Sequence, residues 1–147
     1  MKKSQSGFTL IELVVVIVLL GILGVTALGK FEDLSADAAD AAAKGIAGEL
    51  SSASSINYAA RLVNTSKGET ISSASCNTAD LGKLMQTGSV PTDNLTYAFG
   101  SGNPNTITST DTDCASGQSF TCTIVDDRGS NTVAASNAAE ASIICTG

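Results

Sequence analysis

The sequence predicts an α+β fold in which one long N-terminal α-helix, with its inner half in a membrane, packs on a small antiparallel β-sheet. Apolar residues recur with helical spacing from near the N-terminus to about residue 62, and no proline interrupts them. Short segments of alternating apolar and polar residues appear only after Pro91. A chain with its helix first and its strands later favours an α+β arrangement over a parallel sheet.

The inner half of the helix, residues 8–29, is apolar enough to span a bilayer. Residues 13–29 include seventeen positions without a charge, and extension back to Phe8 adds only one charged residue, Glu12. At about 1.5 Å per residue, this length nearly matches the hydrocarbon core of a membrane. Lys2 and Lys3 precede the segment, so the positive-inside rule places the N-terminus in the cytoplasm and the rest of the chain outside.

The outer half of the helix, residues 30–62, is expected to lie on a globular head, residues 63–147, and it carries an apolar stripe. The stripe can pack against the chain's own sheet or against other subunits, and we expect different faces to do each. The whole helix is predicted from Phe8 to Leu62. The stripe repeats at steps of three and four, close to the helical period. Its members are Phe31, Leu34, Ala38, Ala42, Ile46, Leu50, Ala53, Ile56, Ala60 and Val63.

The head is predicted to hold one short helix and an antiparallel sheet. Ala79–Met85 reads as the short helix, capped by Asn77 or Thr78. Residues 127–131 have turn composition, and Gly100–Gly117 is too polar to bury a core, so it is expected to be an exposed loop. The predicted strands are Leu95–Phe99, Ser119–Val125, a returning strand Thr132–Ala135, and a last strand Ala141–Thr146.

Four cysteines follow the hydrophobic segment, on the side that is expected to be translocated: Cys76, Cys114, Cys122 and Cys145. None forms a C-x-x-C pair, and the chain has no histidine to complete a zinc site. An even count in an oxidising compartment predicts two disulfides, for which three pairings are possible. Four reduced thiols would instead suit a cytosolic protein.

Two simpler interpretations of the N-terminus do not account for Glu12. A cleaved secretory signal would need a carboxylate inside its apolar run, although residues 25–27 could serve as a small-residue cleavage site. A plain membrane anchor gives no reason for an ionised carboxylate that is costly in lipid. A cut before Phe8 would create an amine four residues from Glu12, able to pair within one chain or between neighbouring chains.

The string Gly7-Phe8-Thr9-Leu10-Ile11-Glu12-Leu13, followed by an uncharged apolar run, resembles the processing motif of type IV prepilins and related pseudopilins. The resemblance implies a pilin-like fold and removal of residues 1–7 as a leader by a prepilin peptidase. It further implies N-methylation of Phe8 and an assembly role for Glu12, which would pair with the N-terminus of a neighbouring subunit. The other implied partners are the inner membrane and its assembly platform.

A second resemblance covers residues 34–61, which are similar to pilins of the mannose-sensitive haemagglutinin type. The chain departs from the family where members often carry a proline near the end of the membrane segment. Gly29 stands there, and glycine weakens a helix by only about 1 kcal/mol relative to alanine. A fixed proline kink is therefore not expected.

Composition argues against catalysis, nucleic-acid binding and a bound cofactor. Without histidine, Ser-His-Asp and Cys-His arrangements are excluded, and no phosphate-binding loop or zinc-protease motif occurs. Without Lys2 and Lys3, six of the eight basic residues remain against fourteen acidic ones, a net charge of −8 with no basic patch. The pairs Asp111 with Asp113 and Asp126 with Asp127 lack the spacing of a calcium loop, so no metal site is expected.

The sequence thus predicts a non-enzymatic structural subunit of a type IV pilus, a homo-oligomeric filament for adhesion or motility. The precursor would lie in the inner membrane, and the assembled form would be extracellular. One alternative is a type II secretion pseudopilin in a short periplasmic fibre. The other is a secreted, disulfide-bonded binding domain behind an ordinary signal peptide. A conductive fibre is disfavoured because Phe8, Phe31 and Tyr58 are the only aromatic residues of the long helix.

Overall fold

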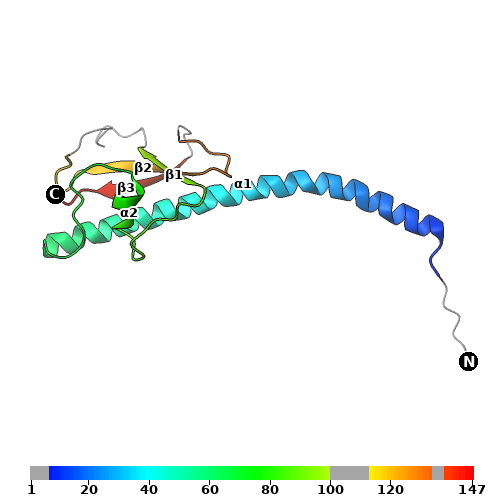
Figure 1. The fold of residues 1–147 in the computed structure, drawn as a ribbon, viewed down its shortest axis with the longest axis horizontal. Coiled ribbons are helices and arrows are strands. Elements are labelled where there is room, and N and C mark those ends of the chain that lie inside the picture. The colour runs from blue at the N-terminus through cyan, green and yellow to red at the C-terminus, as the bar shows by residue number, and fades with distance from the viewer. Residues whose placement is uncertain (1–6, 100–112, 134–137) are drawn as a thin grey trace, which may run out of the picture. The chain divides into compact units, whose positions relative to one another are not determined.

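The structure is a computed structural model that describes residues 7–99, 113–133 and 138–147. It contains a long helix α1 (Leu10–Val63), a short helix α2 (Thr78–Gly82) and strands β1 (Leu95–Phe99), β2 (Ser119–Asp126) and β3 (Ala139–Ile144) (Figure 1). The chain divides into two units, residues 1–35 and residues 36–147. The α+β fold predicted from the sequence, a long N-terminal helix with a small antiparallel sheet, is confirmed.

The first unit consists of the N-terminal part of α1 and the residues before it. Its large apolar side chains are exposed, and the helix includes a stretch long and apolar enough to cross a membrane, with mean hydropathy 2.8. One polar group in this stretch is satisfied locally, because the Thr26 hydroxyl donates to the carbonyl oxygens of Leu23 and Ile22. A helix with an apolar surface and internally bonded backbone is the form that lipid tolerates.

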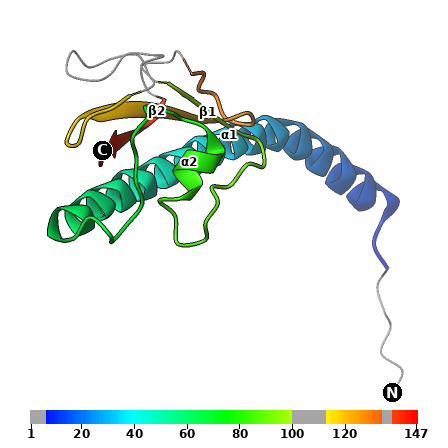
Figure 2. The same ribbon diagram turned by 60° about the vertical axis from the view of Figure 1, so that its left-hand side comes forward.

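The second unit is built around an antiparallel three-stranded sheet in the order β1-β2-β3. Figure 2 shows the neighbouring strands β1 and β2. Leu95 lies opposite Asp126 at one end of the β1–β2 pair, and Ser119 lies opposite Ile144 in the β2–β3 pair. The central strand β2 is the most deeply buried of the three strands. Its position between two partners explains this burial, since neither of its edges faces water.

The core of the second unit is small, and α1 supplies mainly small residues to it. The buried residues of α1 are Ala39, Asp40, Ala43, Ala47, Leu50, Ser54 and Asn57. The largest fully buried apolar side chains of the core are Phe120, Leu50, Leu81, Ile124 and Ile143. Phe99 and Phe120 pack with ring centroids 5.9 Å apart. With so few large side chains, packing alone supplies limited stability.

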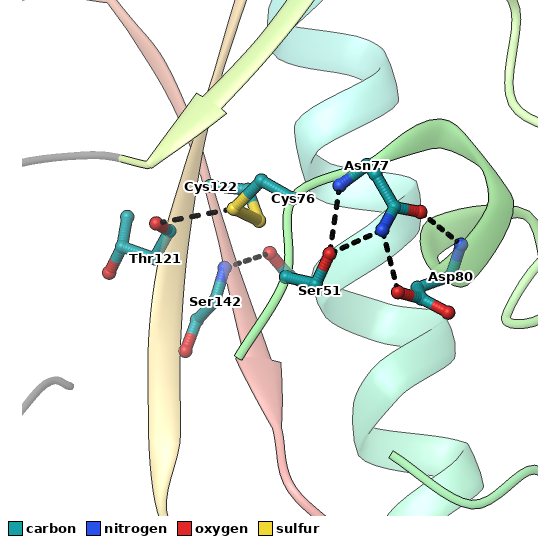
Figure 3. Close-up of a disulfide and its surroundings, with 8 residues drawn as sticks. Ser51, Cys76, Asn77, Asp80, Thr121, Cys122 and Ser142 are labelled. Carbon is teal, nitrogen blue, oxygen red and sulfur yellow. Dashed lines mark hydrogen bonds between the residues drawn. A yellow bond between two sulfur atoms is a disulfide. The ribbon is translucent and has the colours of Figure 1, made fainter. Parts of the chain in front are cut away.

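The predicted apolar stripe on the outer half of α1 faces the chain's own sheet only in part. Only Leu50 of the stripe is fully buried, whereas Phe31, Leu34 and Ile56 are exposed. The reason is a close approach of β3 to the helix. Ser142 N–H donates to Ser51 Oγ at 3.0 Å (Figure 3), and Ile144 N–H donates to Ser54 Oγ at 2.7 Å. A strand backbone within hydrogen-bonding distance of a helix leaves room for alanine and serine, not for a row of large side chains.

Element boundaries follow the predictions closely in most places. α1 begins two residues later than predicted, and α2 ends three residues earlier than expected, with Asn77 as its N-cap. The Asn77 side chain accepts from Asp80 N–H at 2.8 Å, and this cap is visible beside the Cys76–Cys122 disulfide in Figure 3. β1 matches the prediction, while β2 extends one residue further and β3 lies two residues earlier.

The predicted returning strand Thr132–Ala135 was wrong for the two residues that the structure describes, and residues 134 and 135 lie outside them. Thr132 and Val133 are not in a strand, and β2 pairs instead with β3. The segment after β2 is bound elsewhere: the backbone N–H groups of Ser130 and Asn131 donate to the carboxylate of Asp40 on α1. The chain is therefore tied to the helix where a hairpin would have turned back along β2.

Candidate processing and assembly site

The predicted processing site lies in non-helical chain directly before α1. Gly7, Phe8 and Thr9 are outside the helix, and all three are exposed. Phe8 is 92% exposed, and nothing lies within 4 Å of where a Cβ on Gly7 would be. The peptide bond between Gly7 and Phe8 is thus sterically open to an enzyme. The rest of the predicted leader, including Lys2 and Lys3, lies outside the described residues.

The helix begins at Leu10 because Thr9 and Glu12 cap each other. Thr9 N–H and the Thr9 hydroxyl donate to Glu12 Oε2 at 3.0 and 2.7 Å, and Glu12 N–H donates to Thr9 Oγ1 at 3.3 Å. This reciprocal arrangement is a capping box, which satisfies backbone donors that the first helical turn leaves without partners. Glu12 also lies in the first turn, where the helix dipole favours a negative charge.

The predicted contact of Glu12 with an amine at Phe8 stays a prediction, because that amine exists only after cleavage. Thr9 was missed in the sequence analysis, although a signal for it was present. The pattern Thr9-x-x-Glu12 directly before an apolar helical run is the sequence form of a capping box. Besides its predicted role in assembly, the Glu12 carboxylate has a local function: it fixes where the helix starts.

The four cysteines form two disulfides, both in the second unit. Cys76 pairs with Cys122 and Cys114 pairs with Cys145, with Cα–Cα distances of 5.6 and 5.9 Å. The sequence alone had left three pairings open. Cys122 is in the central strand, and Cys145 follows the last strand directly. The Cys76–Cys122 disulfide therefore links the segment just before α2 to β2. The Cys114–Cys145 disulfide links the segment before β2 to the C-terminal end of the chain.

Of the acidic pair Asp126 and Asp127, considered as calcium ligands, Asp126 is committed to other bonds. Asp126 is buried and accepts from Arg128 Nη2 at 2.7 Å and from Arg128 Nε at 2.9 Å. This side-chain hydrogen bonding by Arg128 lowers the pKa of Asp126 to about 2. Asp111 lies outside the described residues. Within those residues, no group of three or more acidic or cysteine side chains could hold a metal ion.

A second buried carboxylate, Asp40, joins α1 to the segment after β2. Its Oδ2 accepts from the Ser130 hydroxyl at 2.6 Å and from Ser130 N–H at 3.2 Å. Hydrogen bonding by the Ser130 hydroxyl lowers the pKa of Asp40, against the effect of burial. Gly129 also lies against this carboxylate, so that any side chain there would collide with it. Sequence reasoning missed Asp40 because a single acid on a helix carries no pattern.

Comparison with known protein families gives one match. Residues 2–28 match the model of the prokaryotic N-terminal methylation motif. No curated protein and no solved structure matched the chain. The motif implies processing by a prepilin peptidase, and it is shared by pilins and pseudopilins. It does not reach residues 34–61, so the resemblance to the mannose-sensitive haemagglutinin type is unconfirmed.

The matched residues coincide with the processing site, the capping box and the exposed apolar helix. The helix-first, antiparallel-sheet fold of the chain is the one that the resemblance implied. The motif supports a type IV pilin-like or pseudopilin protein, and the match is confined to residues 2–28.

Proposed function

We propose that the chain is the structural subunit of a type IV pilus, a surface filament for adhesion or motility. A prepilin peptidase removes residues 1–7 and methylates Phe8, and the processed subunit waits in the inner membrane. The assembly platform then extracts it into a homo-oligomeric filament in which Glu12 meets the Phe8 amine of a neighbour. The observation that carries this proposal is the methylation motif on a helix whose apolar side chains are exposed.

The exposed apolar side chains explain why the subunit would move from membrane to filament. In the membrane, lipid covers the inner half of α1; outside it, about 25 cal/mol of unfavourable free energy accompanies each exposed square ångström of apolar surface. Only other copies of the same helix offer a cover of matching length and polarity. A charged pair between Glu12 and an amine would give the helices a fixed register, because an unpaired charge there is costly.

Substitution of Glu12 tests this proposal. We expect Glu12→Gln to leave cleavage and methylation intact, yet to remove the subunit from the filaments sheared off the cell surface. The control is Glu32→Gln, which removes a charge from an exposed position on the same helix. Normal filaments from Glu12→Gln cells would contradict the proposed role of this carboxylate.

A pseudopilin of a type II secretion system has the same N-terminal features and is distinguished by where the fibre is found. In that case the wild-type chain would be processed but retained in the cell envelope, and its deletion would block secretion of folded proteins. A sheared surface fraction that lacks the wild-type subunit would favour this second function over a pilus.

A further inference from the structure

A cleft of about 500 Å³ opens on the second unit, between α1 and the segments at residues 68–69 and 83–86. Its walls are mainly apolar and include Ile56, Leu84 and Met85. Ile56 is 68% exposed, although it is a large apolar residue well beyond the predicted membrane segment. Lipid therefore does not cover this surface, and the described part of the chain leaves it open to solvent.

The charge at the edge of the cleft is negative. Glu49 and Glu69 both line it, and neither has a salt-bridge partner among the described residues. Lys83 is also in the lining, but its ammonium group is held by Asp80 at 2.8 Å. Since Lys83 and Asp80 offset each other, two glutamates remain. The cleft is thus suited to a ligand with an apolar surface and a positive charge beside it.

The side of α1 that carries Lys30, Phe31 and Leu34 has this combination of groups. Glu32 and Asp33 of the same segment lie toward the other side of the helix. Phe31 and Leu34 are 69% and 62% exposed, and their spacing of three residues places them on one side of the helix. Once the subunit has left the membrane for a filament, these two side chains also lack a cover of lipid. Lys30 adjoins them, and its only ion pair in the described structure is a long, exposed contact of 3.8 Å to Asp33.

We propose that the cleft of one subunit binds the Lys30–Leu34 face of α1 from a second copy of the chain. Phe31 and Leu34 would lie against Ile56 and Leu84, and Lys30 would lie near Glu49 and Glu69. This contact rests on the proposed function, because it brings together subunits of one filament. It is distinct from the pairing of Glu12 with a terminal amine, and it accounts for two apolar surfaces that neither lipid nor the chain's own core covers.

Cysteine cross-linking in assembled filaments tests the contact. The Phe31→Cys and Ile56→Cys substitutions are combined in one chain, and sheared filaments are oxidised and analysed on non-reducing gels. Two cysteines form a disulfide only when their Cα atoms come within about 7 Å. We expect a ladder of linked subunits from this pair and none from either single variant. The control pair, Phe31→Cys with Leu62→Cys, uses an exposed α1 residue outside the cleft lining and should give no ladder.

The outcomes separate this contact from the proposed function. Filaments without a ladder, or with equal ladders from both pairs, would overturn the contact while the pilus function stands. Absence of filaments from the wild-type chain would instead overturn the proposed function. If the variant with Phe31→Cys and Ile56→Cys does not form filaments, a pair of charge-reversal substitutions tests the contact instead. Lys30→Glu should reduce the yield of filaments severalfold, and Glu49→Lys in the same chain should restore it; lack of restoration would overturn the contact.

Discussion

The buried carboxylate of Asp40 accepts a 2.6 Å hydrogen bond from the hydroxyl of Ser130, ninety positions further along the chain. This bond joins the middle of α1 to the segment that leaves the central strand. The neighbouring Asp126 and Arg128 form a second tie in the same segment. Both ties depend on ionised carboxylates, so they make the stability of the second unit dependent on pH.

We expect the second unit to lose stability as the pH falls from about 4 to about 2. Asp126 has an ordinary pKa of 3.8, lowered to about 2 by its hydrogen bonds with Arg128, and the pKa of Asp40 is also lowered. A lowered pKa means that the folded state binds fewer protons than the unfolded state. The contribution is therefore fully present above the unfolded pKa and lost as the pH falls through the folded value.

The measurement for this pH dependence is the urea midpoint of the processed subunit in detergent at pH 5, 3.5 and 2.5. The methyl NMR signals of Ile124 and Ile143 report on the sheet rather than on α1. Asp126→Asn should reduce the decrease in urea midpoint with falling pH. Asp127→Asn, which changes an exposed neighbour, should leave that decrease as in the wild type. A wild-type urea midpoint that does not change with pH would contradict a stabilising role for the ionised carboxylates of Asp40 and Asp126.

Ser54→Ala should destabilise the second unit by about 1–3 kcal/mol, because it leaves the Ile144 N–H buried without an acceptor. Ser54 itself has no exposed surface. Ser55→Ala is the matched control, since the Ser55 hydroxyl is exposed and donates only to Ser51 O within the same helix. Equal urea midpoints for the two variants would show that the serine contact with β3 does not stabilise the fold.

Gly68→Ala should be more destabilising than Gly88→Ala, although both glycines have positive φ angles, +79° and +72°. A left-handed conformation costs an alanine roughly 1–2 kcal/mol at either site. At Gly68 the new Cβ would also collide with the Asn57 amide oxygen, whereas nothing lies within 4 Å at Gly88. That amide oxygen accepts from Glu69 N–H at 2.7 Å. The collision would therefore break this hydrogen bond, which holds the segment after α1 to the helix. Thermal unfolding of both variants provides the comparison.

Replacement of both Cys114 and Cys145 by serine should lower the free energy of unfolding by about 2–4 kcal/mol and release the end of β3. The link closes a separation of 31 residues, and Cys145 directly follows the strand. Hydrogen exchange of a peptide covering residues 139–147 should become faster in the folded protein. The double serine variant of Cys76 and Cys122 should also lose stability, but with β3 still protected. Similar exchange of β3 in both double variants would refute this local role of Cys145.

The sequence predicted the regular elements well where a repeating pattern was present. The period of α1, the alternation of β1 and β2, and the cap at Asn77 are local signals, and each appears in the structure close to its predicted place. Local signals do not state which side of a helix the sheet will approach. The side of α1 that meets the sheet therefore carries mainly alanine and serine, because the hydroxyls of Ser51 and Ser54 bind β3 and bring its backbone close to the helix.

The prediction of a returning strand at Thr132–Ala135 was wrong for a similar reason. Thr132 follows a segment of turn composition, and a hairpin was the simplest local solution. The bonds of Asp40 to Ser130 and Asn131 span about ninety positions, and no periodicity connects such distant residues. At the N-terminus, by contrast, the signal is local, so the sequence alone revealed the motif from Gly7 to Leu13. The structure added the capping box formed by Thr9 and Glu12.

Intact-mass spectrometry of filaments sheared from the producing cells tests whether the chain is a processed filament subunit. We expect one species with the mass of Phe8 to Gly147 plus one methyl group and less four hydrogens. That single value requires cleavage after Gly7, methylation of Phe8, two disulfides and assembly on the cell surface. A soluble chain that begins near Leu28 would contradict it, because the exposed apolar helix would then be a discarded signal rather than part of a filament.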